Sequence, residues 1–328
     1  MRVNRNLVAK KAGVSSATVS RVFNSPATVS DVLRDKVLSA AKELGYSPNL
    51  AAAQLRRSGT GVIAVVEIAK KGRPYYWGSL ASFDWFYGQA MRGLQKAIEQ
   101  TSWQLRFASI TSGEDLKQLE QTCDGIIGYD IDSSDEEEIF SDLAVPCILC
   151  HHTMPHSSLC RFSTDNEKGG VIQAQYLKDL GKTKPLYVTG YLHEVEPHLH
   201  RYQGFSSVGW DHLHMAEIDF GKRGEMEKYA HEVNNLMRSG HIDSIAAVND
   251  FALTKLLMHL DAPLTSVGYD AAPFTNFLPG TIASIDLHIE KIYAKALSCL
   301  IAHLAGEKLE SRTFIPSLVI KGEEGMNR

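Results

Sequence analysis

Small polar side chains that could hydrogen-bond to the edges of DNA bases are concentrated in residues 12–24, AGVSSATVSRVFN. Gly13 predicts a tight turn, and Ser15 predicts the N-cap of the helix that follows it. Val19, Val22 and Phe23 would form one apolar face of this helix. Its other face begins with small residues and continues with hydrogen-bond donors, which lets a helix end approach base edges in a major groove. The residues of this second face are Ser16, Ala17, Ser20, Arg21 and Asn24.

Arg21 has the side chain best suited to DNA contact in this segment. A guanidinium can bind guanine through two hydrogen bonds or clamp a phosphate, and direct base contacts are also expected at Ser16 and Ala17. Residues 1–60 carry ten Lys and Arg and three acidic residues, a net charge of +7, which leaves −11 on the other 268 residues. A basic end on an acidic body favours a polyanion at that end alone.

A further helix must support the polar one. Ser30 predicts its N-cap, and Gly45 predicts a left-handed C-cap. Four residues are expected to close a small three-helix core: Val32, Val37, Ala41 and Leu44. An ordinary helical subdomain is the alternative interpretation, but the turn, caps, charge and helix face agree with one another on DNA binding.

Residues 49–57, NLAAAQLRR, allow two interpretations. Asn49 can cap a helix of about two turns, which is marginally stable alone in water. The segment is then either a flexible linker or a hinge helix that becomes ordered on DNA. In the second case Leu55 could insert as an apolar wedge between base steps in the minor groove.

From Gly61 onward, short apolar strands alternate with helices. Strands are expected near residues 61–68, 103–110, 123–130, 145–150, 185–190, 244–250 and 265–270. Such alternation predicts parallel sheets covered on both faces, whose ligands bind beyond the carboxyl ends of the strands. Five polar residues stand at these ends and are candidate ligand contacts: Asp130, Asn249, Asp250, Tyr269 and Asp270.

Two further groups of side chains have alternative interpretations. Phe86 and Tyr87 belong to an aromatic-rich stretch and either reach a ligand cleft or pack in the core. The segment CILCH, residues 147–151, has the spacing of a haem-attachment motif. Cys147 and Cys150 are nevertheless expected to be small buried residues of an apolar strand, with no metal or haem.

Segments 8–24, 29–49 and 51–57 together resemble the DNA-binding head and hinge of the LacI/GalR family of bacterial regulators. The resemblance implies that Ser16, Ala17 and Arg21 read the major groove. It also implies paired hinge helices over residues 49–57 in a homodimer, with Asn49 and Ala52 at the DNA and Leu55 intercalated. The DNA operator should then be palindromic.

The start of the first helix departs from the family pattern. The family usually has Thr followed three residues later by an acid, whereas this chain has Asn4 and Leu7. Asn4 can still cap the helix and remains a candidate DNA contact, but the reciprocal half of the capping box is absent.

The body is similar, more weakly, to the family's sensor, a periplasmic-binding-protein-like fold of two doubly wound α/β subdomains around a cleft. This resemblance implies effector contacts from Arg201, Asn249 and Asp270, with the Phe220 ring against the ligand. Carboxylate, amide and guanidinium groups suit sugar hydroxyls, and an aromatic face suits the apolar side of a pyranose. A purine or nucleoside effector is the alternative, and a sugar-binding transport protein is a more distant one.

The expected organisation is a helix-turn-helix head over residues 1–47, a hinge and linker over 48–60, and a sensor over 61–328. Within the sensor, the first subdomain would comprise about 61–162 and 288–314, and the second about 163–287 and 315–328. The chain shows no catalytic motif of the common enzyme classes, so neither an enzyme nor a cofactor is expected. No stretch of about 18 apolar residues or signal segment appears, so a cytoplasmic protein without a membrane partner is expected.

Overall fold

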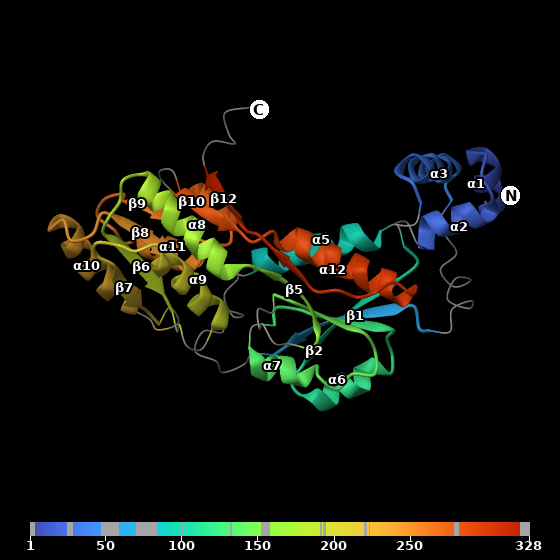
Figure 1. Ribbon diagram of the computed structural model, residues 1–328, viewed down its shortest axis with the longest axis horizontal. Helices are drawn as coiled ribbons and strands as arrows, with labels where there is room; N and C mark the ends of the chain where they lie inside the picture. Colours follow the sequence, from blue (N-terminus) through green and yellow to red (C-terminus); the bar gives the residue numbers. More distant parts are fainter. Residues whose placement is uncertain are drawn as a thin grey trace.

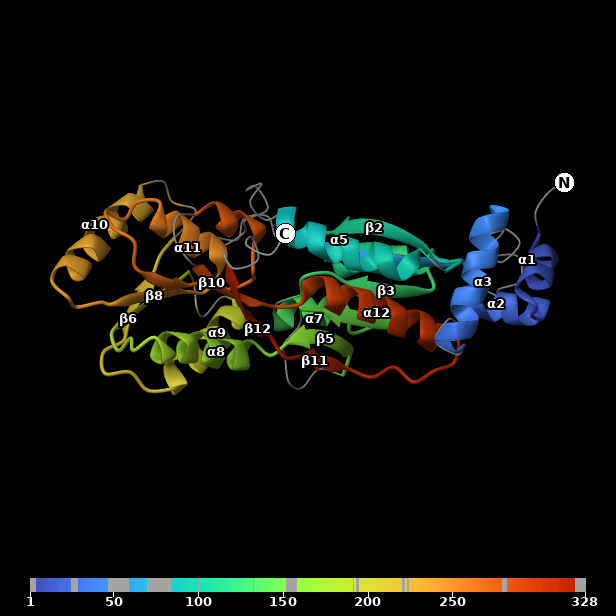
Figure 2. The ribbon, with the colours of Figure 1, turned by 90° about the horizontal axis from the view of Figure 1, so that it is seen from above.

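The computed structural model describes residues 4–24, 29–46, 59–69, 84–99, 101–131, 133–151, 158–190, 192, 195–219, 222, 224–278 and 282–321. A helical head and two lobes, each built on one sheet, follow one another along the long axis of the molecule (Figures 1 and 2). The predicted fold class, an all-α head followed by two α/β units, is confirmed.

The head contains three short helices, α1 (Arg5–Ala12), α2 (Ser16–Asn24) and α3 (Asp31–Leu44). Asn4 caps α1 by accepting a hydrogen bond from the backbone N–H of Leu7. Gly13 ends α1 with φ of 63°, and Gly45 ends α3 with φ of 63°, as the sequence predicted. The helices pack on a small apolar core formed by Val8, Ala9, Ala12, Val19, Val22, Val37, Ala40 and Ala41.

One prediction about α3 is wrong, and the predicted N-cap position is confirmed. Val32 is 82% exposed and takes no part in the core. The buried residues of this helix follow the stripe through Val37, and Val32 precedes Val37 by five residues, which places it about 140° away around the helix. Ser30 does occupy the N-cap position, but its side chain makes no capping hydrogen bond.

The first lobe is built on a parallel sheet with the order β11-β5-β4-β3-β1-β2. The strands are β1 (Val62–Ile68), β2 (Gln104–Ile110), β3 (Gly125–Gly128), β4 (Cys147–Cys150), β5 (Cys160–Thr164) and β11 (Arg312–Phe314). Helices α5 (Asp84–Ile98) and α12 (Ile289–Leu304) cover one face, and α6 (Gly113–Glu120) and α7 (Ser134–Ile139) cover the other (Figure 1). The inner strands β1, β3 and β4 are apolar and mostly buried, as expected of strands covered on both faces of the sheet.

The cysteines of β4 are part of this core. Cys147 and Cys150 are buried, and burial raises the pKa of both thiols above the ordinary value. Their burial confirms the expectation that they serve as small buried residues of an apolar strand.

The second lobe has the sheet order β12-β10-β9-β8-β6-β7. Its strands are β6 (Pro185–Thr189), β7 (His214–Glu217), β8 (Ser244–Ala247), β9 (Thr265–Val267), β10 (Ile282–Asp286) and β12 (Ser317–Lys321). Helices α8 (Asn166–Asp179) and α9 (Glu196–Ser207) lie on one side, and α10 (Glu225–Arg238) and α11 (Asp250–Leu257) on the other (Figure 2). The sheet is parallel except for β12, which pairs antiparallel with β10.

The chain passes between the two sheets three times, after β5, after β10 and after β11. These crossings bring the carboxyl ends of strands from both lobes to the region between the lobes, where a ligand of this architecture is expected.

Within the described ranges, none of the helices is long and apolar enough to cross a membrane.

Candidate functional site

The outward face of α2 carries most of the residues predicted to contact DNA. Ser15, Ala17 and Arg21 are exposed, and Ser16 and Ser20 are half-buried. The Ser15 side chain accepts a hydrogen bond from the backbone N–H of Thr18 at 3.0 Å, which confirms its predicted capping position. The helix therefore begins with small side chains and presents a guanidinium one turn later, the arrangement required to enter a major groove.

Arg5 is a residue of this surface that the sequence analysis did not select. Its Nε donates a hydrogen bond to Ser16 Oγ at 2.7 Å. The contact joins the first residue of α1 to the first residue of α2. The sequence signal was only an additional arginine in the basic segment, since a contact across 11 residues depends on how the two helices pack.

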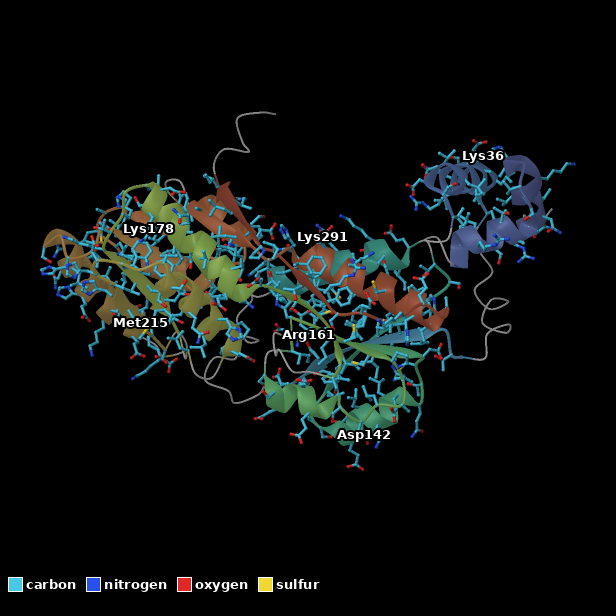
Figure 3. The ribbon with its side chains drawn as sticks, viewed as in Figure 1. Lys36, Asp142, Arg161, Lys178, Met215 and Lys291 are labelled. Atoms are coloured by element: carbon cyan, nitrogen blue, oxygen red, sulfur yellow. The ribbon has the colours of Figure 1, made fainter. Side chains whose placement is uncertain are left out.

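Exposed lysines of α1 and α3 add positive charge to the head. Lys10, Lys11, Lys36 and Lys42 are exposed, and Lys36 extends from α3 (Figure 3). Lys11 pairs with Glu43, with 2.5 Å between Nζ and Oε2. Exposed lysines of this kind attract phosphates without reading sequence.

The remaining predicted contacts stand at helix ends or fall outside the described residues. Asn24 is the last residue of α2, and Asn4 is exposed with its side-chain oxygen engaged in the α1 cap. The hinge residues Asn49, Ala52 and Leu55, and the aromatic residue Phe220, lie outside the described residues.

A buried ion pair marks the ligand side of the second lobe. Arg201 of α9 lies with Nη1 3.2 Å from Asp270 Oδ1, and their side chains are 7% and 9% exposed. Arg201 also donates from Nε to Asn166 Oδ1 at 2.9 Å and from Nη1 to the Val248 carbonyl at 2.8 Å. Its guanidinium stacks over the Tyr269 ring, with 4.0 Å from Cζ to the ring centroid. Arg201 is thus fixed by contacts on several sides.

Asp270 lies in a turn that needs support. Asp270 and Ala271 have successive positive φ values of 96° and 52°, a region that costs energy for residues other than glycine. The Ser284 hydroxyl accepts from the Ala271 N–H at 2.9 Å, and Asp250 Oδ2 accepts from the Ala272 N–H at 2.6 Å. Ser284 in turn donates to the Asp250 carboxylate. The two side chains hold the turn that presents Asp270.

The prediction that Asp250 contacts the ligand is therefore wrong. Asp250 was a candidate ligand contact at the end of a strand, but it is fully buried beneath the turn and its carboxylate is occupied by Ser284 and Ala272. Asn249 is buried as well and caps α11, with Oδ1 accepting from the Ala252 N–H at 2.8 Å. Its amide nitrogen can still donate to a ligand, and its oxygen keeps one lone pair.

The environment of Asp270 changes its acidity. Burial raises its pKa to about 6, against the attraction of Arg201, which lowers the pKa, and Asp130 adds a small increase. Asp130 belongs to the first lobe, two residues after the end of β3, so its charge acts on Asp270 from the other lobe. The charge of Asp270 therefore changes near pH 6, and the affinity for a ligand that Asp270 contacts should change with it.

The first lobe contributes an aromatic surface at the carboxyl ends of its strands. Phe86 contacts Tyr129 and His151, with ring centroids at 5.9 and 4.8 Å. Asp130 has φ of 54°, and its N–H donates to the Tyr293 hydroxyl at 3.1 Å. The positive φ and this hydrogen bond set the position of the Asp130 carboxylate.

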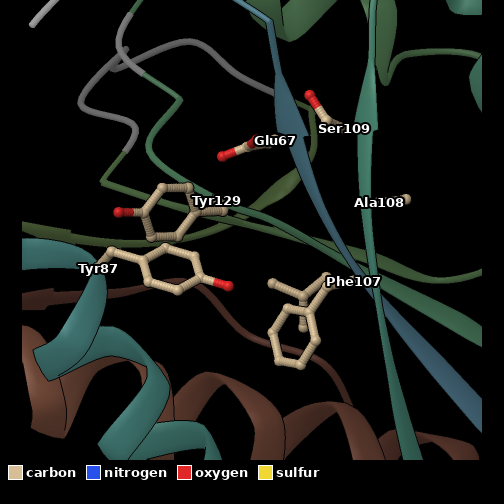
Figure 4. Close-up of a pocket in the computed structure, with 7 residues that line it drawn as sticks. Glu67, Tyr87, Phe107, Ala108, Ser109 and Tyr129 are labelled. Atoms are coloured by element: carbon tan, nitrogen blue, oxygen red, sulfur yellow. The ribbon is translucent and has the colours of Figure 1, made fainter. Parts of the chain in front are cut away.

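A cavity of about 230 Å³ opens beside this surface (Figure 4). Tyr87 and Tyr129, 5.6 Å apart between ring centroids, form one side, and Glu67 and Phe107 approach from β1 and β2. The cavity lies within the first lobe and includes none of the polar side chains around Arg201. We place the ligand chemistry at Arg201 because the polar groups that could orient a ligand converge there.

The two lobes also touch through aromatic rings. Trp85 of α5 lies 6.3 Å from Phe274 of the 3₁₀ helix Pro273–Phe277, measured between ring centroids.

The sequence analysis did not identify Asn166, His151 or Tyr293 as residues of the site. His151 follows β4 directly, so it could have been selected, like Asp130, as a polar residue at the carboxyl end of a strand. Asn166 and Tyr293 lie on helices, and their positions in the site depend on how those helices pack.

Comparison with known proteins gives a consistent assignment. Residues 7–49 match the family described as bacterial regulatory proteins, lacI family. The sucrose operon repressor of Pediococcus pentosaceus is 25% identical over 340 residues, covering 98% of this chain and 99% of that protein.

Two solved structures have the same fold along nearly the whole chain. The CelR–cellobiose complex has a TM-score of 0.63 at 22% identity and covers 97% of this chain and 98% of its own. The lac repressor dimer bound to operator and the anti-inducer ONPF has a TM-score of 0.59 at 20% identity, with the same coverage.

Proposed function

The chain belongs to the lacI family of bacterial regulatory proteins, and from this premise we propose that it represses carbohydrate-utilisation genes and is released from its operator by a sugar. It is a DNA-binding transcriptional regulator and not an enzyme. The observation that carries the sugar assignment is the convergence of Arg201, Asp270 and Asn249 at the strand ends of the second lobe.

DNA recognition is assigned to α2. Its exposed start would enter the major groove, with Ser16 and Ala17 at base edges and Arg21 at a guanine or a phosphate. Ser15, Ser20, Asn24 and Asn4 would border this contact. In the hinge, Asn49 and Ala52 would lie against the minor groove, and Leu55 would insert between base steps.

A sugar effector suits the chemistry of the cleft. Hydroxyl pairs need both donors and acceptors, which Asp270, Arg201 and the Asn249 amide supply. Phe86, Tyr87 and Asp130 would contribute from the first lobe and Phe220 from the second. The relatives support this assignment, since one is named for a sucrose operon and another was solved with cellobiose.

A homodimer would present two heads to a palindromic operator. The lac repressor, which has the same fold, was solved as a dimer on its operator. In this chain β2 is an edge strand of the first sheet and its Phe107 is 49% exposed, a feature that favours burial against a second copy. We assign residues 1–47 to the head, 48–60 to the hinge and 61–328 to the sensor.

Regulation would follow from movement of the lobes. A sugar between them would favour one relative orientation, alter the spacing of the paired hinges, and so weaken their ordering on DNA. The coupling must be reciprocal, so operator binding would weaken sugar binding by the same factor.

Calorimetric titration of the full-length protein with a panel of sugars and nucleosides tests the effector class. We expect at least one sugar to bind and to lower the affinity for operator DNA. Binding of a nucleoside alone would assign the effector to the alternative class. A ligand that binds without changing operator affinity would contradict the proposed regulation.

A further inference from the structure

Arg5 and Ser16 bring the starts of two helices together on the proposed DNA-reading face. Asn4 caps α1, which makes Arg5 its first residue, and Ser16 is the first residue of α2. The hydrogen bond from Arg5 Nε to Ser16 Oγ, 2.7 Å long and partly buried, links them. Arg5 is therefore positioned from α1 beside the end of α2 that approaches base edges in helix-turn-helix proteins.

The donor that this hydrogen bond uses leaves the rest of the guanidinium available. Arginine has five N–H donors, of which Nε carries one. With Nε engaged, the two terminal nitrogens still form a planar fork that matches the O6 and N7 acceptors of guanine. The bond also fixes the orientation of the guanidinium plane, which lowers the entropy lost when the fork binds a base.

The hydroxyl of Ser16 keeps part of its own capacity. It accepts from Arg5 through one lone pair, so its O–H can still donate to a neighbouring base. Two of the three acidic residues of the head pair with other cations: Asp31 lies 2.7 Å from Arg34, and Glu43 pairs with Lys11. These two carboxylates are thus engaged away from Arg5.

We propose that Arg5 is a further specificity-determining residue, which reads one guanine in each operator half-site, and that Ser16 positions it. The proposal rests on the assignment of α2 to the major groove. It adds a base contact from outside α2, next to those of Ser16 and Ala17. It also predicts that substitution at Ser16 affects the base pair read by Arg5.

The test uses the full-length protein and an operator selected from a random duplex library. Affinities are measured for all single base-pair changes in a half-site, with the wild type, Arg5→Ala, Arg5→Lys and Ser16→Ala. Arg34→Ala is the matched control, because it removes one positive charge from the head at a residue that pairs with Asp31 on α3. The salt dependence of binding is measured in parallel.

We expect one guanine whose replacement weakens wild-type binding by about 5- to 150-fold, as for a bidentate arginine contact. Arg5→Ala should lose discrimination at that base pair alone, Arg5→Lys should lose part of it because an ammonium has no planar fork, and Ser16→Ala should reduce it. Discrimination at the other positions should remain in the two Arg5 variants, which also shows that their heads are folded. Ser16→Ala should in addition change discrimination at the base pair that Ser16 itself contacts. Arg34→Ala should keep the whole pattern.

Two results would overturn the proposal in distinguishable ways. If Arg5→Ala weakens all duplexes equally and keeps the guanine preference, Arg5 binds phosphate and the proposed function stands without it. If the wild type prefers no duplex in the library, both the proposal and the proposed function fail.

Discussion

Arg201 and Asp270 form a buried ion pair between α9 and the turn that follows β9, with 3.2 Å between Nη1 and Oδ1. The pair is held from both sides, Arg201 by Asn166 and Val248 and the Asp270 turn by Asp250 and Ser284. Such a site is organised before a ligand arrives, so little binding energy is spent on ordering its side chains.

Asp270→Asn should abolish the effector response and leave operator binding intact. The change removes a carboxylate that can accept two hydroxyl hydrogen bonds, while Asn tolerates the positive φ at this position. Effector affinity is measured by calorimetry and operator affinity by fluorescence anisotropy. An unchanged response to the effector would show that Asp270 is outside the site.

The stability of the protein should depend on pH through Asp270. Its pKa of about 6 in the folded state exceeds the usual 3.8, so the folded protein binds this proton more tightly than the unfolded chain. The resulting stabilisation is present below pH 4 and is lost as pH rises through 6, by up to about 3 kcal/mol. Urea unfolding of the wild type and Asp270→Asn between pH 4 and 7 measures the difference, and a constant difference would contradict the assignment.

Gly93→Ala should destabilise the first lobe. A Cβ on Gly93 of α5 would lie 2.2 Å from the backbone oxygen of Glu290 on α12, so the two helices would have to move apart. Overpacking of this kind typically costs about 1–3 kcal/mol.

Gly88→Ala in the same helix is the matched control. Its Cβ would meet only the end of the Arg92 side chain at 3.7 Å, and alanine favours the helix by about 0.5–1 kcal/mol. In thermal unfolding, Gly93→Ala should therefore lower the melting temperature and Gly88→Ala should raise it slightly. Equal melting temperatures would mean that α5 and α12 are not closely packed at Gly93.

Leu55→Ala should weaken binding to the operator by about tenfold or more and leave binding to random DNA nearly unchanged. The reason is that an apolar wedge contributes only where the minor groove opens for it. Competition anisotropy with operator and random duplexes measures both affinities. Equal losses on both duplexes would assign residues 49–57 to a linker and not to an inserted hinge.

Local features of the fold were predictable from the sequence. The apolar strands, the Gly13 and Gly45 helix ends and the Asn4 and Ser15 caps each depend on a few neighbouring residues. Val32 was assigned wrongly because hydrophobic character alone does not determine which side of a helix faces the core.

The site was predictable only in part. Asp130 and Asp270 could be selected because they end strands, and the general geometry of parallel sheets places such residues near a ligand. The links from Arg5 to Ser16 and from Arg201 to Asn166 join residues 11 and 35 positions apart, and the burial of Asp250 depends on Ser284, 34 residues later. Contacts of this kind come from packing, which no local pattern records.

The most direct test of the account is the affinity of the full-length protein for its selected operator in the presence of random competitor DNA at moderate salt, with and without the sugar panel. We predict a strong preference for the operator, relieved by a sugar and absent in Arg21→Ala, whose sensor lobes should stay folded. Equal affinity for operator and competitor under all of these conditions would contradict the central claim.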